Sequence, residues 1–114
     1  MLSTLENLFN LARERKKFPA EGSYTNKLLS DKSLSKKKVI EEINELIEAV
    51  ENNSNKIHEA ADVFYHLLMY LEANDIKIED VMSELEKRKK WVTTITIFLQ
   101  KFYVERFLVK KFMR

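Results

Sequence analysis

The 114-residue sequence contains no cysteine, and it has only one glycine and one proline. Without cysteine the chain forms no disulfide, no thiolate zinc site and no cysteine nucleophile. A sheet-rich fold needs turn residues every ~8–12 positions, and this sequence has too few of them. Apolar residues make up 45% and charged residues 33% of the chain, a globular balance that argues against intrinsic disorder. The composition therefore predicts an all-α protein.

Long apolar runs and a strong excess of one charge are also missing. The net charge is +2, divided into −2 over residues 1–90 and +4 over residues 91–114, which is poor support for nucleic-acid binding. The longest apolar-leaning run, Trp91 to Leu99, is shorter than the ~20 residues that span a bilayer. The first 15 residues lack the apolar run of a signal peptide. We expect a cytoplasmic protein with no membrane span and no nucleic-acid partner.

Apolar residues recur at helical spacing in five segments. The expected helices begin at Ser3, Tyr24, Ser35, Lys56 and Ile78, and the last one ends at Lys90. Ser3 and Glu6 have the spacing of a capping box, and Ser23 precedes the second helix as a cap. A polar connection is expected from Ser30 to Ser35. Short connections favour antiparallel neighbours, so the pattern predicts an up-down helical bundle.

The last 24 positions break this pattern. Residues 91–114 hold six of the twelve aromatic residues, a basic excess, and apolar residues that share no single helical face. We therefore divide the chain into a helical domain at residues 1–90 and an atypical basic and aromatic tail at residues 91–114. The tail is open to three interpretations: a partner-binding or oligomer-forming arm, a membrane-surface contact, or an appendage without function.

Two pairs of carboxylates lie on the third and fourth expected helices. Glu42 and Glu45 are three residues apart, and so are Glu59 and Asp62, so each pair projects from one helix face. Antiparallel packing through the turn at residues 51–55 brings the two pairs face to face. Clustered carboxylates repel one another unless a cation neutralises them, and hard oxygen ligands favour Mg²⁺ or Mn²⁺. The pattern predicts a divalent metal site.

Solvated surface is the competing interpretation of these acids. Glutamate is a good helix former, so Glu42 and Glu45 alone indicate no more than an exposed face. Asp62 is different because it stands between Ala60-Ala61 and Val63-Phe64, and a carboxylate among core-forming residues is costly unless it is paired or metal-bound. Glu48 extends the acidic face and is interpreted as solvated surface.

Three segments carry a resemblance to a known family. Residues 22–29 read Gly-Ser-Tyr-Thr-Asn-Lys-Leu-Leu, residues 38–45 read Lys-Val-Ile-Glu-Glu-Ile-Asn-Glu, and residues 58–68 read His-Glu-Ala-Ala-Asp-Val-Phe-Tyr-His-Leu-Leu. Over roughly residues 4–90 the chain resembles phosphoribosyl-ATP pyrophosphatase, a member of the all-α nucleotide pyrophosphohydrolase group that also contains MazG and the dimeric dUTPases.

The resemblance implies an enzyme and its ligands. It implies hydrolysis of phosphoribosyl-ATP to phosphoribosyl-AMP and pyrophosphate, the second step of histidine synthesis, in a homodimer. Mg²⁺, or else Mn²⁺, would be bound by Glu42, Glu45, Glu59 and Asp62. Glu41, or a ligand carboxylate such as Glu42, would orient the attacking water.

Substrate contacts are expected from neighbouring side chains. Lys38 lies one helical turn before Glu42 and is the first candidate for a phosphate, with Lys27 the second. Tyr24 either stacks on a base or packs under its loop. His66 follows Asp62 by four residues and is expected to support that carboxylate from behind. A solvated side chain is the competing interpretation for both lysines.

Two other functions remain open. A MazG-type pyrophosphatase would act on ordinary or damaged nucleoside triphosphates. A non-catalytic helical interaction module would carry the acids as solvated surface and use its tail to bind a partner.

Overall fold

The computed structural model describes residues 2–99, and the regular secondary structure within that range is entirely helical. The elements are α1 (Ser3–Lys17), α2 (Tyr24–Ser30), α3 (Lys32–Asn52), α4 (Lys56–Ala73) and α5 (Ile78–Leu99). This confirms the predicted all-α class. The first compact unit ends at Ile78 and holds α1 to α4, whereas the second begins at Glu79 and is described by itself.

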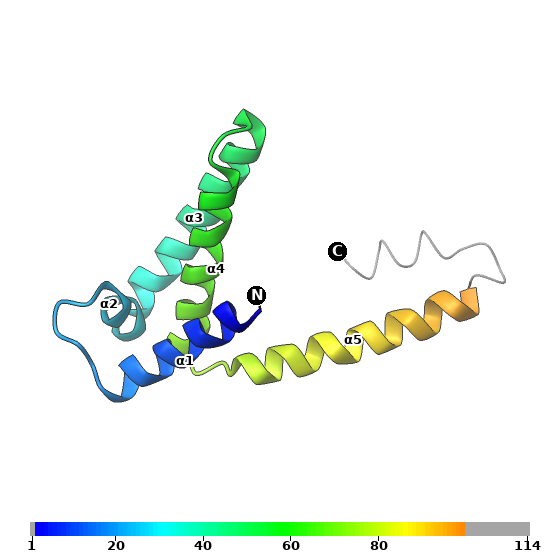
Figure 1. Cartoon of the computed structure of the whole chain (residues 1–114), viewed down its shortest axis with the longest axis horizontal. Helices are drawn as coiled ribbons and strands as arrows, with labels where there is room; N and C mark the ends of the chain where they lie inside the picture. The colour runs from blue at the N-terminus through cyan, green and yellow to red at the C-terminus, as the bar shows by residue number, and fades with distance from the viewer. Residues whose placement is uncertain (1, 100–114) are drawn as a thin grey trace. The chain divides into compact units, whose positions relative to one another are not determined.

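Helices α3 and α4 form an antiparallel hairpin that dominates the first unit (Figure 1). The turn between them places Asn53 at φ 51° and Asn55 at φ 52°, the left-handed region that asparagine tolerates better than most residues. The backbone N–H groups of Asn53 and Ser54 donate to carbonyls of the last turn of α3, which closes that helix. Helix α2 contacts both arms of the hairpin, and α1 contacts α2 and α4.

The hydrophobic core lies where α1, α2 and α4 meet. Its buried members are Ala12, Leu28, Leu29 and Met69, with Leu8, Leu34 and Tyr65 packed around them. Gly22, at φ 77°, reverses the chain before α2 because glycine adopts a positive φ without steric cost. The core therefore holds α2 against α4, the helix that carries the predicted site residues Glu59 and Asp62.

The observed helix starts confirm one expected cap, contradict another and move the start of α3. Ser23 caps α2 as predicted, since its hydroxyl accepts from the Asn26 N–H at 3.4 Å. Ser3 is already the first residue of α1, whose start has no side-chain cap, so the predicted capping box is wrong. Helix α3 begins at Lys32 because Asp31 accepts from the Leu34 N–H at 3.0 Å and caps it there. Most of the polar connection expected up to Ser35 is therefore helical.

Helix α5 continues beyond the predicted end at Lys90 and reaches Leu99. Its β-branched residues lower helix propensity only weakly, and the segment contains neither proline nor glycine. The Thr94 hydroxyl donates to the Lys90 carbonyl at 2.9 Å across this boundary. The remainder of the predicted tail, residues 100–114, lies outside the described residues, and the division at residue 90 stays a prediction. Within residues 2–99, no helix combines the length and apolarity needed to cross a membrane.

Candidate active site

The α3–α4 hairpin brings three of the four predicted metal ligands into one cluster. Oxygen atoms of Glu42, Glu45 and Glu59 lie within 4.8 Å of one another. Glu42 and Glu45 share one face of α3, and the antiparallel return of the chain places Glu59 in the first turn of α4 opposite them. Glu42 is 9% exposed, whereas Glu45 remains accessible. The cluster therefore has a buried end and an open end.

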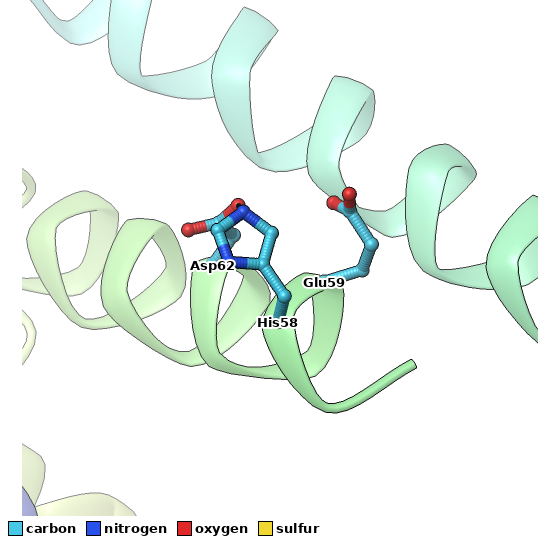
Figure 2. Close-up of side chains that lie close together, drawn as sticks. All are labelled: His58, Glu59 and Asp62. Atoms are coloured by element: carbon cyan, nitrogen blue, oxygen red, sulfur yellow. Dashed lines mark ion pairs between the residues drawn. The ribbon is translucent and has the colours of Figure 1, made fainter. Parts of the chain in front are cut away.

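Asp62 lies in a second group that overlaps the first through Glu59. His58, Glu59 and Asp62 also offer ligand atoms within 4.8 Å of one another. The His58 Nε2 atom is 3.3 Å from Oδ2 of Asp62, and Figure 2 shows these two side chains together while Glu59 extends toward α3. The side chain of Asp62 is 37% exposed and Phe64 is also exposed, so Asp62 is not surrounded by core as its neighbours suggested. Part of the apolar face of α4, including Phe64, is therefore left exposed by the other helices of the first unit.

Burial and neighbouring charges raise the pKa of two carboxylates of the cluster, Glu42 and Glu59. The pKa of Glu42 is raised above its ordinary value, first by burial and then by the charge of Glu45. The pKa of Glu59 is raised by burial of its carboxylate, by the charge of Glu45 and by a hydrogen bond with Glu45. The charge of Asp62 acts in the same direction on both groups. Together the four acids form one strongly negative site.

Two oxygens of this site have no hydrogen-bond partner among residues 2–99. The Oε2 atoms of Glu42 and Glu59 are both buried and both unpartnered. A buried carboxylate oxygen without a partner carries the full cost of its desolvation. A divalent cation with a preference for oxygen ligands removes that cost and the mutual repulsion together. The donor set therefore fits Mg²⁺ or Mn²⁺.

Lys38 and Glu41 pair with each other beside the cluster. The Lys38 ammonium lies 3.3 Å from Oε2 of Glu41, one turn along the exposed side of α3. The pKa of Lys38 is raised, first by this hydrogen bond and then by the charge of Glu41, with a smaller contribution from Glu42. Lys38 is therefore a permanent positive charge at the edge of the acidic site.

Tyr24 and His66 contact each other close to Glu42, which interacts electrostatically with both. The Tyr24 hydroxyl is 2.9 Å from the His66 Nε2 atom, and the His66 Nδ1 atom is 2.8 Å from the backbone carbonyl of Asp62. His66 was expected to contact the carboxylate of Asp62. Its ring contacts the backbone carbonyl of Asp62 instead. Tyr24 stacks on Tyr65, with ring centroids 6.5 Å apart. His66 therefore has a different partner from the expected one, whereas the packing of Tyr24 on α4 leaves both of its interpretations open.

Lys27 lies apart from this group. It is an exposed residue of α2, and its ammonium has no ion pair among residues 2–99. The sequence placed it near the substrate because it follows the Ser-Tyr-Thr-Asn segment. Lys27 follows Tyr24 by three positions and so shares its side of α2, but no ion pair of its ammonium lies among residues 2–99.

His58 and Glu48, which the sequence did not assign to the site, both lie beside it. His58 contacts Asp62 even though 72% of its side chain is exposed. Glu48 lines an open cavity of about 190 Å³, together with Glu45, Glu59 and polar side chains of the α3–α4 turn. The i, i+3 spacing from Glu45 to Glu48 was the available signal, because it continues the acidic face toward the turn.

The chain is similar in sequence to several known proteins. The chain is 44% identical over 90 residues to a phosphoribosyl-ATP pyrophosphatase of Clostridium acetobutylicum, covering 75% of this chain and 81% of that protein. It is 42% identical to the enzyme of the same name from Listeria welshimeri, covering 79% and 89%. It is 43% identical to the histidine biosynthesis bifunctional protein HisIE of Pyrococcus furiosus, covering 78% of this chain and 43% of that protein. No solved structure matches the chain.

The match also extends to a family as a whole. Residues 2–89 match the phosphoribosyl-ATP pyrophosphohydrolase family, a range that contains every site residue described above. The resemblance predicted from the three sequence segments is confirmed. The chain, with its two carboxylate pairs on an all-α hairpin, belongs to the phosphoribosyl-ATP pyrophosphohydrolase family.

Proposed function

We propose that this protein hydrolyses phosphoribosyl-ATP to phosphoribosyl-AMP and pyrophosphate, a step of histidine biosynthesis. Family membership and relatives of that name at 42–44% identity support the reaction. The observation that carries it is the cluster of Glu42, Glu45 and Glu59, in which two buried oxygens lack partners. A solvated acidic face on a non-catalytic interaction module would have no reason to bury such oxygens.

The cluster binds Mg²⁺, with Mn²⁺ as a substitute, in this proposal. Glu42, Glu45 and Glu59 supply oxygens from the first group, and Asp62 supplies one from the second, since Glu59 belongs to both. A bound Mg²⁺ supplies positive charge that polarises the phosphoryl oxygens and activates a water molecule. The acidic side chains alone would repel the substrate, so the cation also makes the site compatible with a polyphosphate.

The neighbouring residues act on the substrate directly. Lys38 binds a phosphate oxygen, exchanging its present partner Glu41 for the more strongly charged group. Glu41, released from Lys38, accepts a proton from the attacking water and orients it. Glu42 is the second candidate for that role. Tyr24 binds the substrate at the edge of the site, and Lys27 is a more distant phosphate contact.

Pyrophosphate release from phosphoribosyl-ATP tests the function. We expect release that depends on Mg²⁺ or Mn²⁺ and that falls by about 10- to 100-fold or more in Glu45→Gln. Glu51→Gln, an exposed position on the same helix, is the matched control and is expected to keep wild-type activity. Faster release from the common nucleoside triphosphates would instead favour a MazG-type enzyme.

A homodimer is the proposed assembly, because a large apolar surface of the hairpin is exposed. The exposed apolar residues of α3 form one stripe, made of Ile40, Ile43, Ile47 and Val50. Ile57 and Phe64 add exposed apolar surface on α4. Contiguous patches of this kind mark interaction surfaces. Light scattering is expected to give the mass of a dimer, and Ile47→Asp to reduce it to a monomer, whereas a wild-type monomer at micromolar concentration would contradict the proposal.

A cytoplasmic location completes the proposal. A histidine biosynthesis enzyme needs a nucleotide substrate that cells make in the cytoplasm, and the absence of cysteine is compatible with that compartment. Cell fractionation followed by immunoblotting tests the location, and recovery in a membrane or secreted fraction would contradict it.

A further inference from the structure

Two hydrogen bonds join α2 to α4, and their partners on α4 make different further contacts. Tyr24 bonds to His66 at 2.9 Å, and the neighbouring Thr25 bonds to the Tyr65 hydroxyl at 2.6 Å. Tyr65 packs against the hydrophobic core. His66 instead continues to the backbone carbonyl of Asp62, a residue of the acidic site. The bond of Tyr24 therefore connects α2 to the acidic site, and the bond of Thr25 connects α2 to the hydrophobic core.

The partners of His66 determine where its proton lies. A backbone carbonyl only accepts hydrogen bonds, so the Nδ1 atom, 2.8 Å from the Asp62 carbonyl, carries the hydrogen. In the neutral imidazole the other nitrogen is then an acceptor. The Tyr24 hydroxyl consequently donates to Nε2, and its own oxygen keeps only its lone pairs. His66 is 6% exposed, so solvent does not compete for this bond.

Tyr24 is placed to meet a ligand of the acidic site. It is 44% exposed, and its ring stacks on Tyr65 with an interplanar angle of 16°. The charges of Lys38, Glu42 and Glu41 all act on its hydroxyl group. Tyr24 therefore packs on α4 through Tyr65 and His66 and lies within electrostatic range of these three residues of α3.

We propose that His66 is a positioning residue for Tyr24. Because His66 Nε2 accepts the hydrogen bond from the Tyr24 hydroxyl, the Tyr24 oxygen is left to accept a hydrogen bond from a donor on the sugar or base of the nucleotide. This inference rests on the proposed function. Phosphate oxygens carry no proton to donate near neutral pH, so Tyr24 would recognise the nucleoside part of the substrate and leave the phosphates to the lysine and the cation. The contact is made in the ground state, so its loss weakens binding rather than the chemical step.

Steady-state kinetics on phosphoribosyl-ATP with the full chain test this role. Tyr24→Phe removes the hydroxyl, and His66→Asn keeps an amide N–H for the Asp62 carbonyl while removing the acceptor for Tyr24. Each is expected to raise KM about fivefold to tenfold with kcat changed less than about threefold. Because both act through one bond, the double variant is expected to match either single variant. If the donor is the adenosine 2′-hydroxyl, the effect of Tyr24→Phe disappears with the 2′-deoxy substrate; if it persists there, the donor is another sugar or base group.

Tyr65→Phe is the matched control, because it removes the parallel bond to Thr25 and keeps both stacked rings. We expect it to lower the melting temperature about as much as Tyr24→Phe and to leave KM within about twofold. Equal rises in KM for the two variants, or an unchanged KM in Tyr24→Phe, would overturn the inference while leaving the proposed function intact. A wild type inactive on phosphoribosyl-ATP would contradict the proposed function, and the inference with it.

The tautomer is tested independently of activity. With only two histidines in the chain, nitrogen NMR at pH about 8 assigns His66 by its loss in His66→Asn. We expect the hydrogen on Nδ1, and a hydrogen on Nε2 instead would overturn the inference.

Discussion

Glu42 on α3 and Glu59 on α4 place carboxylate oxygens within 4.8 Å of each other, and each leaves its Oε2 atom buried without a hydrogen-bond partner. Two negative groups at this separation oppose folding in the absence of a cation. The hairpin tolerates them because the core of α1, α2 and α4 stabilises the unit elsewhere. The stability of the protein and its metal affinity are therefore linked.

Divalent cations are expected to stabilise the protein. Mg²⁺ at 100 times its dissociation constant adds about 2.7 kcal/mol to the free energy of unfolding, because it binds the folded state alone. Thermal melts with and without Mg²⁺ measure the change. Glu42→Gln should lose the metal-dependent shift, and Glu51→Gln on the exposed side of α3 should keep it. An equal shift in both variants would mean that the cation binds elsewhere.

The stability of the metal-free protein is expected to depend on pH in a specific direction. The folded-state pKa values of Glu42 and Glu59 are raised above their ordinary value of 4.5, mainly by burial. Groups of this kind contribute stability below the ordinary pKa, and the contribution is lost as pH rises through the raised value. Urea unfolding in metal-free buffer should therefore show the wild type losing stability relative to Glu42→Gln from pH 4.5 upward. A difference that stays constant across this range would contradict the raised pKa.

Replacing Lys38 is expected to weaken substrate binding. Lys38→Met keeps the length of the side chain and removes its charge, so a charge-assisted hydrogen bond worth about 1.5–3 kcal/mol is lost. We expect KM for phosphoribosyl-ATP to rise about 10- to 100-fold. Lys36→Met, at an exposed position without an ion pair in the described structure, should leave KM unchanged. Comparable effects in the two variants would indicate a general charge effect.

Ser35→Ala is expected to stabilise the protein. Ser35 is 1% exposed and its hydroxyl has no hydrogen-bond partner, so the folded state carries an uncompensated desolvation cost. Removing that oxygen should raise the free energy of unfolding by about 1 kcal/mol. Chemical unfolding measures it against Ser33→Ala, an exposed position on the same helix. A loss of stability in Ser35→Ala would show that the hydroxyl has a partner in solution, such as a buried water.

Sequence reasoning was most successful where a local pattern decides the outcome. The Ser23 cap, the break predicted at residues 51–55 and observed at residues 53–55, and the pairing of Glu42 with Glu45 on one helix face all follow from spacings of a few residues. It was least successful at helix ends. Asp31 starts α3 earlier than expected, and α5 passes Lys90 without a break, because a single cap or its absence outweighs average propensity.

The hydrogen-bond partners of the site residues could not be predicted from the sequence either. His66 was expected to support the Asp62 carboxylate because four residues separate them, and it contacts the backbone carbonyl instead. Its other nitrogen bonds to Tyr24, which is 42 positions away in the chain. Such a contact depends on how α2 packs on α4, and no periodicity within either helix encodes that.

Composition, local spacing and motifs were enough to predict the helical class, the family and the acidic residues of the site. The buried carboxylate oxygens without partners in the described residues, the contact of His58 with Asp62 and the hydrogen bond between Tyr24 and His66 became apparent only once the helices were seen packed together. Burial and hydrogen-bond pairing are properties of packed surfaces, which form only after distant segments have come together.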